Sequence, residues 1–140
     1  MSSVVRRFTF CAAHRLMNHG GKCRRLHGHN YVAEVTVRGP IDGYSGMVVD
    51  FGDLKSSIGE WIDLYWDHRT ILNGNDPLLA AMHELFPHGD VYKLIGEPTA
   101  ENMARILLAL VQTRMDERNL PGQTCSVRLW ETENCSAEAF

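Results

Sequence analysis

The chain has 140 residues, of which 44% are hydrophobic and 22% charged, and a formal net charge of -3 at pH 7. This length predicts one domain, residues 1–140, with a single core. The acidic balance gives no electrostatic reason to expect a nucleic acid or an anionic membrane as partner. The sequence has no apolar run long enough to span a bilayer, and the N-terminus MSSVVRRFTF lacks the features of a signal peptide. We therefore expect a cytoplasmic protein that binds neither nucleic acid nor membrane.

Two strands are predicted at the start of the chain. Residues 4–14 alternate, with Phe8, Phe10, Ala12 and His14 on one face. Residues 27–39 are rich in β-branched side chains and end in the turn-forming stretch GPIDGYSG. These two strands are expected to pair as a long hairpin.

Two long helices are predicted further along. Apolar residues recur at helical spacing after Asp50, a potential cap, at Phe51, Leu54, Ile58, Trp61, Ile62 and Tyr65. A second helix within residues 97–119 has Pro98 in its first turn. Its apolar stripe comprises Met103, Ile106, Leu107, Leu110 and Val111. Residues 66–97 are less regular, with a short helix within 73–86 and an extended piece at 91–96.

Two further strands, within residues 123–134 and 135–140, close the chain. The resulting ββααββ order predicts an α+β fold, an antiparallel sheet with two long helices on one face. Such a sheet keeps free edges, which invite strand pairing between subunits.

Three histidines form a candidate metal site. His27 and His29 are separated by one residue on a strand, so they point to the same face. His14, on the partner strand, is placed to supply a third nitrogen. Three histidines with an open fourth position are typical of catalytic zinc, whereas structural zinc has four protein ligands. The alternative is three ordinary polar residues on an exposed face.

The chain contains four cysteines: Cys11, Cys23, Cys125 and Cys135. We expect no structural disulfide, because cytoplasmic thiols stay reduced. Cys11 and Cys125 alternate with apolar residues, which is typical of core thiols. Cys23 lies between Lys22 and Arg24, whose charges favour the thiolate. The residues alone leave open whether Cys23 is a base, a nucleophile or a fourth metal ligand.

Three further positions carry possible chemistry. In WDHR, Asp67 is placed to orient His68 for proton relay, although such a pair is often plain surface sequence. Thr99 lies at a helix start, where it either only caps the helix or also meets a polar ligand. Glu131, if it faces inward, needs either the amino-imino edge of a heterocycle or an arginine as partner.

These motifs occur in a family-specific order: FTFCAAHRL, CRRLHGHNY, GMVVDFGDLK, WDHR, EPTAEN and WET. The chain thereby resembles the 6-pyruvoyl-tetrahydropterin synthase / 6-carboxy-tetrahydropterin synthase family from Phe8 to Thr132. The resemblance implies a tunnelling fold (T-fold), in which subunits join their sheets into an oligomeric β-barrel, as trimers that stack into hexamers. It also implies a pterin substrate.

The resemblance assigns roles to individual residues. It implies Zn²⁺ ligands at His14, His27 and His29, and a catalytic cysteine at Cys23. It further implies an Asp67–His68 relay given by a neighbouring subunit, a pterin anchor at Glu131, and a pterin-binding segment around Thr99.

One spacing favours the branch that forms 6-carboxy-5,6,7,8-tetrahydropterin in queuosine and deazapurine biosynthesis. Three residues separate Cys23 from His27, as in the carboxy branch, whereas the pyruvoyl branch has five. The implied reaction converts 7,8-dihydroneopterin triphosphate to 6-carboxy-tetrahydropterin, triphosphate and acetaldehyde. The alternatives are 6-pyruvoyl-tetrahydropterin synthase and a non-catalytic, zinc-stabilised binding protein on the same fold. A zinc knuckle that binds nucleic acid lacks a clear fourth ligand and a basic face.

Overall fold

A computed structural model describes residues 1–120 and 123–140. Its elements, in chain order, are β1 (Ser2–His14), η1 (Lys22–Arg24), β2 (His27–Gly39), α1 (Phe51–Leu54), η2 (Lys55–Gly59), α2 (Glu60–Tyr65), β3 (Arg69–Asn73), α3 (Leu78–Leu85), β4 (Val91–Leu94), α4 (Ala100–Glu117), β5 (Thr124–Thr132) and β6 (Cys135–Ala139). Here η1 is a 3-10 turn and η2 a π-helical segment. Within these described residues, no helix combines the length and apolar character needed to cross a membrane.

The six strands form one sheet in the order β4-β3-β1-β2-β5-β6. β1 and β2 pair antiparallel along their whole length, from Ser2 opposite Gly39 to His14 opposite His27, which confirms the predicted hairpin. β5 and β6 extend the sheet with further antiparallel pairs. β3, however, runs parallel to both β1 and β4. The expectation of an antiparallel sheet is therefore wrong at this end, and the sheet is mixed.

The strand β3 is the element that the sequence pattern did not predict. It has five residues, too few to show a clear alternation, and its last three are buried by neighbouring elements. The predicted short helix and extended piece are present as α3 and β4. Parallel neighbours need a crossover connection, and α3 supplies it between β3 and β4. The observed order is thus ββαβαβαββ.

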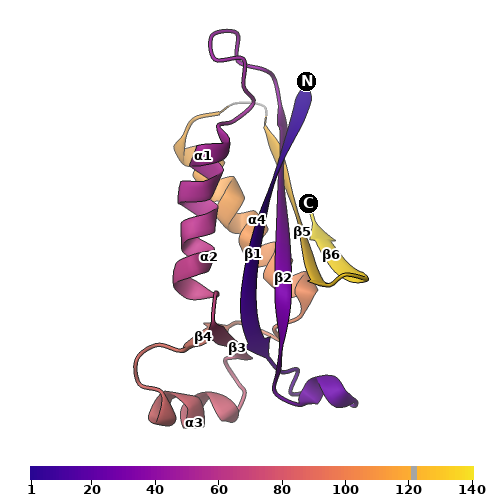
Figure 1. The fold of residues 1–140 in the computed structure, drawn as a ribbon, viewed down its shortest axis with the longest axis vertical. Helices are drawn as coiled ribbons and strands as arrows, with labels where there is room; N and C mark the ends of the chain where they lie inside the picture. The colour runs from indigo at the N-terminus through magenta and orange to yellow at the C-terminus, as the bar shows by residue number, and fades with distance from the viewer. Residues whose placement is uncertain (121–122) are drawn as a thin grey trace.

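Both long helices cover one face of the sheet (Figure 1). The first runs continuously through α1, η2 and α2, and Asp50 caps it by accepting the Gly52 N–H at 2.6 Å. Its predicted stripe is confirmed at the centre, where Leu54 and Ile58 are fully buried. The end of the stripe is more open, since Tyr65 remains 44% exposed. The stripe of α4 packs into the same core.

A glycine allows the first helix to lie close to β1. A Cβ atom on Gly59 would come within 2.9 Å of the Phe8 ring, closer than real Cβ contacts permit. Gly59 ends the π-helical segment, so the irregular turn and the close approach occur at the same place. The helix is thereby held against the strand that carries His14.

The alternation of β1 corrects one prediction. Phe10 and Ala12 are buried under the helices, whereas Cys11 between them is exposed on the opposite face. The prediction that Cys11 is a core thiol is therefore wrong. Cys125 is half-buried against the core, and burial raises the pKa of its thiol.

Candidate metal centre and active site

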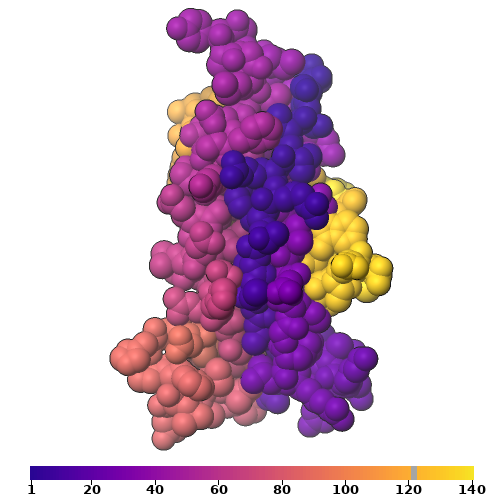
Figure 2. Space-filling view, in the orientation of Figure 1, coloured from indigo at the N-terminus to yellow at the C-terminus, as the bar shows by residue number. Residues whose placement is uncertain are grey.

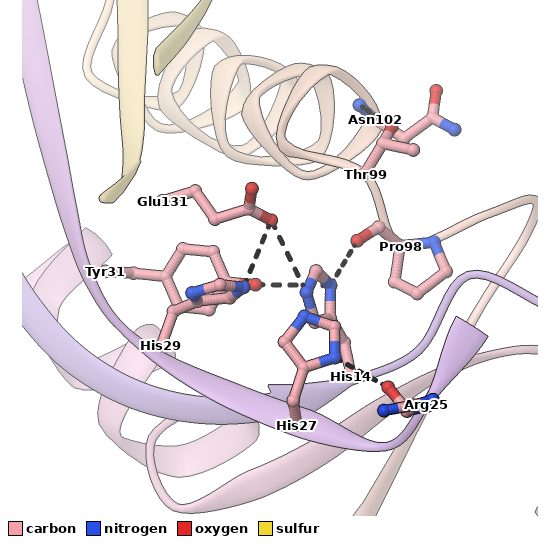
Figure 3. A network of polar contacts seen from close by, with 9 residues as sticks. All are labelled: His14, Arg25, His27, His29, Tyr31, Pro98, Thr99, Asn102 and Glu131. Carbon is pink, nitrogen blue, oxygen red and sulfur yellow. Dashed lines mark hydrogen bonds and ion pairs between the residues drawn. The ribbon is translucent and has the colours of Figure 1, made fainter. Parts of the chain in front are cut away.

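Three imidazoles converge at one end of the β1–β2 hairpin (Figure 3). His14 ends β1 directly opposite His27, and His29 follows two residues later on the same face of β2. One nitrogen of each ring lies within 4.8 Å of the nitrogens of the other two. The structure thus brings together the three predicted metal ligands. His27 and His29 follow His14 by 13 and 15 positions in the sequence, and they meet it because the hairpin register aligns the two strands.

Backbone carbonyls orient two of these rings. His14 Nδ1 lies 2.8 Å from the Pro98 oxygen, and His27 Nδ1 lies 2.6 Å from the Arg25 oxygen. Because a carbonyl oxygen only accepts, Nδ1 of each ring carries the proton and Nε2 keeps its lone pair. The Tyr31 hydroxyl lies 3.3 Å from the same His14 nitrogen. Metal-binding histidines are commonly oriented through their other nitrogen in this way.

Burial keeps these lone pairs available. Desolvation lowers the pKa of His14 and of His29, so both rings are neutral near pH 7. Metal binding requires neutral imidazole. The Nε2 atoms of His14 and His29 are also buried without a hydrogen-bond partner. A metal cation satisfies both nitrogens, so the donor set fits a metal site with three imidazole ligands.

Glu131 lies beside this cluster. Its Oε1 is 3.4 Å from His14 Nε2 and 3.6 Å from His29 Nε2. Among residues 1–120 and 123–140, no arginine forms an ion pair with Glu131, so the alternative of an arginine partner is not met within this part of the chain. The Glu131 carboxylate and His14 Nε2 are therefore two acceptors that face each other without a donor between them. This arrangement also favours a cation or a ligand N–H group at this point.

Thr99 both caps a helix and lines a hollow, as its two predicted roles require. Its Oγ1 accepts the Asn102 N–H at 3.3 Å, so Thr99 caps α4. Thr99 also lines a hollow of about 280 Å³ together with Leu16, Glu131 and Cys135. Pro98 was expected in the first turn of the helix but lies just before the cap. Its carbonyl is therefore outside the helix and contacts His14.

Cys23 lies in the turn η1 of the loop between His14 and His27. It is half-buried, and its carbonyl accepts the Leu16 N–H at 2.9 Å, which fixes the turn to the end of β1. In the part of the chain that the structure describes, the donor atoms that meet within 4.8 Å come from the three histidines and not from Cys23. Metal analysis of a Cys23 variant distinguishes the role of a base from that of a fourth ligand.

Asp67 and His68 form a pair on the other face of the sheet. His68 has a positive φ of 59°, so the two side chains do not diverge as they would on an extended chain. Their atoms Oδ2 and Nδ1 lie 3.0 Å apart, and Asp67 Oδ1 accepts the Cys11 N–H. His68 is 79% exposed and lines a hollow with Cys11, Gly28 and Asn30. Cys11 and His14 project from opposite faces of β1, and in the described residues no hydrogen bond or ion pair joins the Asp67–His68 pair to the three histidines, although His29 also lines this hollow.

The model of the 6-pyruvoyl tetrahydropterin synthase family matches residues 3–140. The chain belongs to this family. It is 36% identical over 140 residues to the 6-carboxy-5,6,7,8-tetrahydropterin synthase of Rickettsia typhi, covering 99% of both chains. It is 38% identical over 138 residues to the Rickettsia bellii enzyme of the same name, again covering 99% of both chains.

Solved structures confirm the predicted fold of the single chain. A catalytic-residue mutant of Plasmodium vivax 6-pyruvoyltetrahydropterin synthase superimposes with a TM-score of 0.78. The match covers 99% of this chain and 96% of that chain at 22% identity, which shows a shared fold.

The contacts that orient the imidazoles were not predicted from the sequence. Tyr31 follows His29 by two residues on the same strand face, so alternation alone indicates that it lies beside the metal site. The carbonyls of Arg25 and Pro98 leave no such signal, because any residue has a carbonyl and only the fold places it.

Proposed function

We propose that the protein is a 6-carboxy-5,6,7,8-tetrahydropterin synthase. The observation that carries the proposal is the full-length similarity to relatives of that name, together with the converging histidines. The reaction takes 7,8-dihydroneopterin triphosphate to 6-carboxy-tetrahydropterin, triphosphate and acetaldehyde. Cleavage of the side chain after loss of triphosphate consumes one water and needs no external oxidant or reductant.

The proposed metal is Zn²⁺. The converging imidazoles of His14, His27 and His29 suit it, and three protein ligands leave a position open for substrate. When bound, zinc supplies a Lewis acid that polarises the side-chain oxygens of the substrate.

The remaining roles belong to the side chains around the cluster. Glu131 anchors the pterin by accepting two hydrogen bonds from its amino-imino edge, and Thr99 lines the same hollow. Cys23, as the thiolate, moves a proton at the carbons beside the ring. Asp67 orients His68, which exchanges the second proton.

The position of the Asp67–His68 pair supports an oligomer. Within the described residues of one chain the pair makes no hydrogen bond or ion pair with the three imidazoles and His68 is 79% exposed, which supports a neighbouring subunit as the source of the pair for each histidine cluster. We propose a homo-oligomer, a trimer or a hexamer of two trimers, in which strand edges pair across subunits. A cytoplasmic location and a place in queuosine biosynthesis accompany this proposal.

A product assay tests the function. Zinc-loaded protein is incubated with 7,8-dihydroneopterin triphosphate, and the products are identified by mass spectrometry. Carboxy-tetrahydropterin with acetaldehyde supports the proposal. Pyruvoyl-tetrahydropterin would keep the fold and the site but move the protein to the other branch, and no turnover with zinc bound favours a non-catalytic protein.

The Cys23→Ala variant tests the role of the thiol. We expect turnover to be abolished while the zinc content stays unchanged. If the zinc content falls together with activity, Cys23 is a ligand and not the base. The Cys135→Ala variant is a matched control, because this exposed thiol also lies near Glu131.

A further inference from the structure

The loop between His14 and His27, together with Leu78 of α3, lines an open hollow of about 720 Å³. Four of its eight lining residues are cationic, namely Arg15, Lys22, Arg24 and Arg25. The others are two glycines and two leucines, and no carboxylate is among them. In a chain with a net charge of -3, this hollow is a local concentration of positive charge. The lobe that carries it lies at the lower end of β1 and β2 (Figure 2).

Three of the four cations have no counter-ion among the residues that the structure describes. Arg15 is paired with the buried carboxylate of Asp76. Within the residues that the structure describes, Lys22, Arg24 and Arg25 form no ion pair. Like charges held close together repel one another, and a multiply charged anion relieves this repulsion.

The loop is held in shape rather than loosely tethered. Its backbone is closed by the Leu16 N–H to Cys23 oxygen bond of 2.9 Å and the His19 N–H to Leu16 oxygen bond of 3.1 Å. The Gly21 N–H donates to His19 Nδ1 at 2.8 Å. The three free cations are therefore presented from a defined turn.

The hollow adjoins the metal centre through consecutive residues. At the end of β1, His14 joins the histidine cluster, Arg15 lines the basic hollow, and Leu16 lines the hollow that contains Glu131. On the other strand, Arg25 lines the basic hollow while its carbonyl orients His27. The basic hollow therefore lies at the same end of the β1–β2 hairpin as the three histidines.

We propose that this hollow is a triphosphate subsite, in which Lys22, Arg24 and Arg25 bind the tail of the substrate. The inference rests on the proposed function, because it takes the substrate to be a pterin with a triphosphate ester. Guanidinium groups bind phosphate oxygens in pairs, and an ammonium group adds a point charge. The hollow also holds the anion while it departs, since elimination converts the ester to free triphosphate beside the same cations.

Binding of inorganic triphosphate to the zinc-loaded protein tests the subsite without catalysis. The double variant Lys22→Gln/Arg24→Gln is expected to weaken this binding by on the order of 100-fold, about tenfold for each lost charge-assisted contact. The matched control is Arg105→Gln, which removes an exposed arginine of α4 outside the hollow and should bind as the wild type does. Equal affinity of the double variant and the control would overturn the proposal.

Steady-state kinetics separates this inference from the proposed function. With 7,8-dihydroneopterin triphosphate, the double variant should raise KM by a similar factor at unchanged zinc content, and salt should weaken wild-type binding more than that of the variant. Wild-type turnover with unaltered KM in the variant overturns the subsite and leaves the function intact. Triphosphate binding that depends on Lys22 and Arg24, without any turnover, supports the anion site and refutes the proposed function.

Discussion

Breaking the ion pair between Arg15 and Asp76 should destabilise the protein far more than breaking a surface pair. The Asp76 side chain is fully buried and accepts hydrogen bonds from Arg15 at both oxygens, with Arg15 Nε at 2.7 Å. A third bond, of 2.8 Å, comes from the Leu78 N–H. The pair joins the end of β1, next to His14, to the turn that precedes α3. The substitution Arg15→Met leaves a buried carboxylate with one of its three donors.

The magnitude follows from the burial. Removing one partner of a buried ion pair costs about 3–5 kcal/mol, because the other charge stays buried without compensation. Arg15 is itself 24% exposed, so water replaces part of the lost contact. We therefore expect the free energy of unfolding to fall by about 3 kcal/mol, the lower end of that range. The exposed pair Arg114–Glu117 is the comparison, and Glu117→Gln should cost about 0.5 kcal/mol or less.

The pH dependence gives a second signature. The hydrogen bonds from Arg15 hold the pKa of Asp76 below its usual range, so the pair stabilises the wild type fully above about pH 4. This stabilisation is lost as the pH falls through the lower, folded-state pKa. In Arg15→Met, burial without the cation raises the pKa of Asp76, and protonation then relieves the penalty. The difference between variant and wild type should therefore be largest near pH 7 and shrink in acid.

Urea unfolding at a fixed protein concentration measures these differences, because subunit association adds to apparent stability. The double variant Arg15→Met/Asp76→Asn should recover most of the lost stability, since it removes the unpaired charge and keeps an acceptor for Leu78. A cost below about 1 kcal/mol in the single variant, the value of a surface pair, would refute the argument from burial. A cost that does not change with pH would refute it as well.

Other predictions concern the site and the core. Glu131→Gln should keep the metal content and raise KM for the pterin by on the order of 100-fold, because two charge-assisted bonds are weakened. The control Glu133→Gln should leave both the metal content and KM unchanged, and loss of metal in Glu131→Gln would make Glu131 a ligand. His27→Ala should lower the bound metal measured by elemental analysis, and full metal content would contradict the three-histidine site; the exposed His83 is the control position. Leu107→Ala, at a fully buried position, should cost about 2–5 kcal/mol in urea unfolding, and a cost near zero would contradict the packing of α4.

Periodicity in the sequence was enough to predict most of the fold. The alternation of Phe8, Phe10, Ala12 and His14 and the helical stripes of α4 survive because long elements repeat their burial pattern many times. β3 was missed because five residues do not establish a period, and its burial comes from β1 and β4 on either side. The burial of Cys11 was predicted wrongly for a different reason. Alternation puts Cys11 opposite Phe10 and Ala12, but only the packing of the helices decides which of the two faces is covered.

For the site, the sequence determined the types and spacing of the donors, including His27 and His29 on one strand face. It also determined the family, through six ordered motifs. Only the tertiary structure decided that His14 lies opposite His27, that the carbonyl of Pro98, 84 positions away, orients the His14 ring, and that Asp67 pairs with His68. The physical reason is that side-chain identity is local, whereas hairpin register, backbone hydrogen bonds and the covered face of a sheet are set by packing between distant segments.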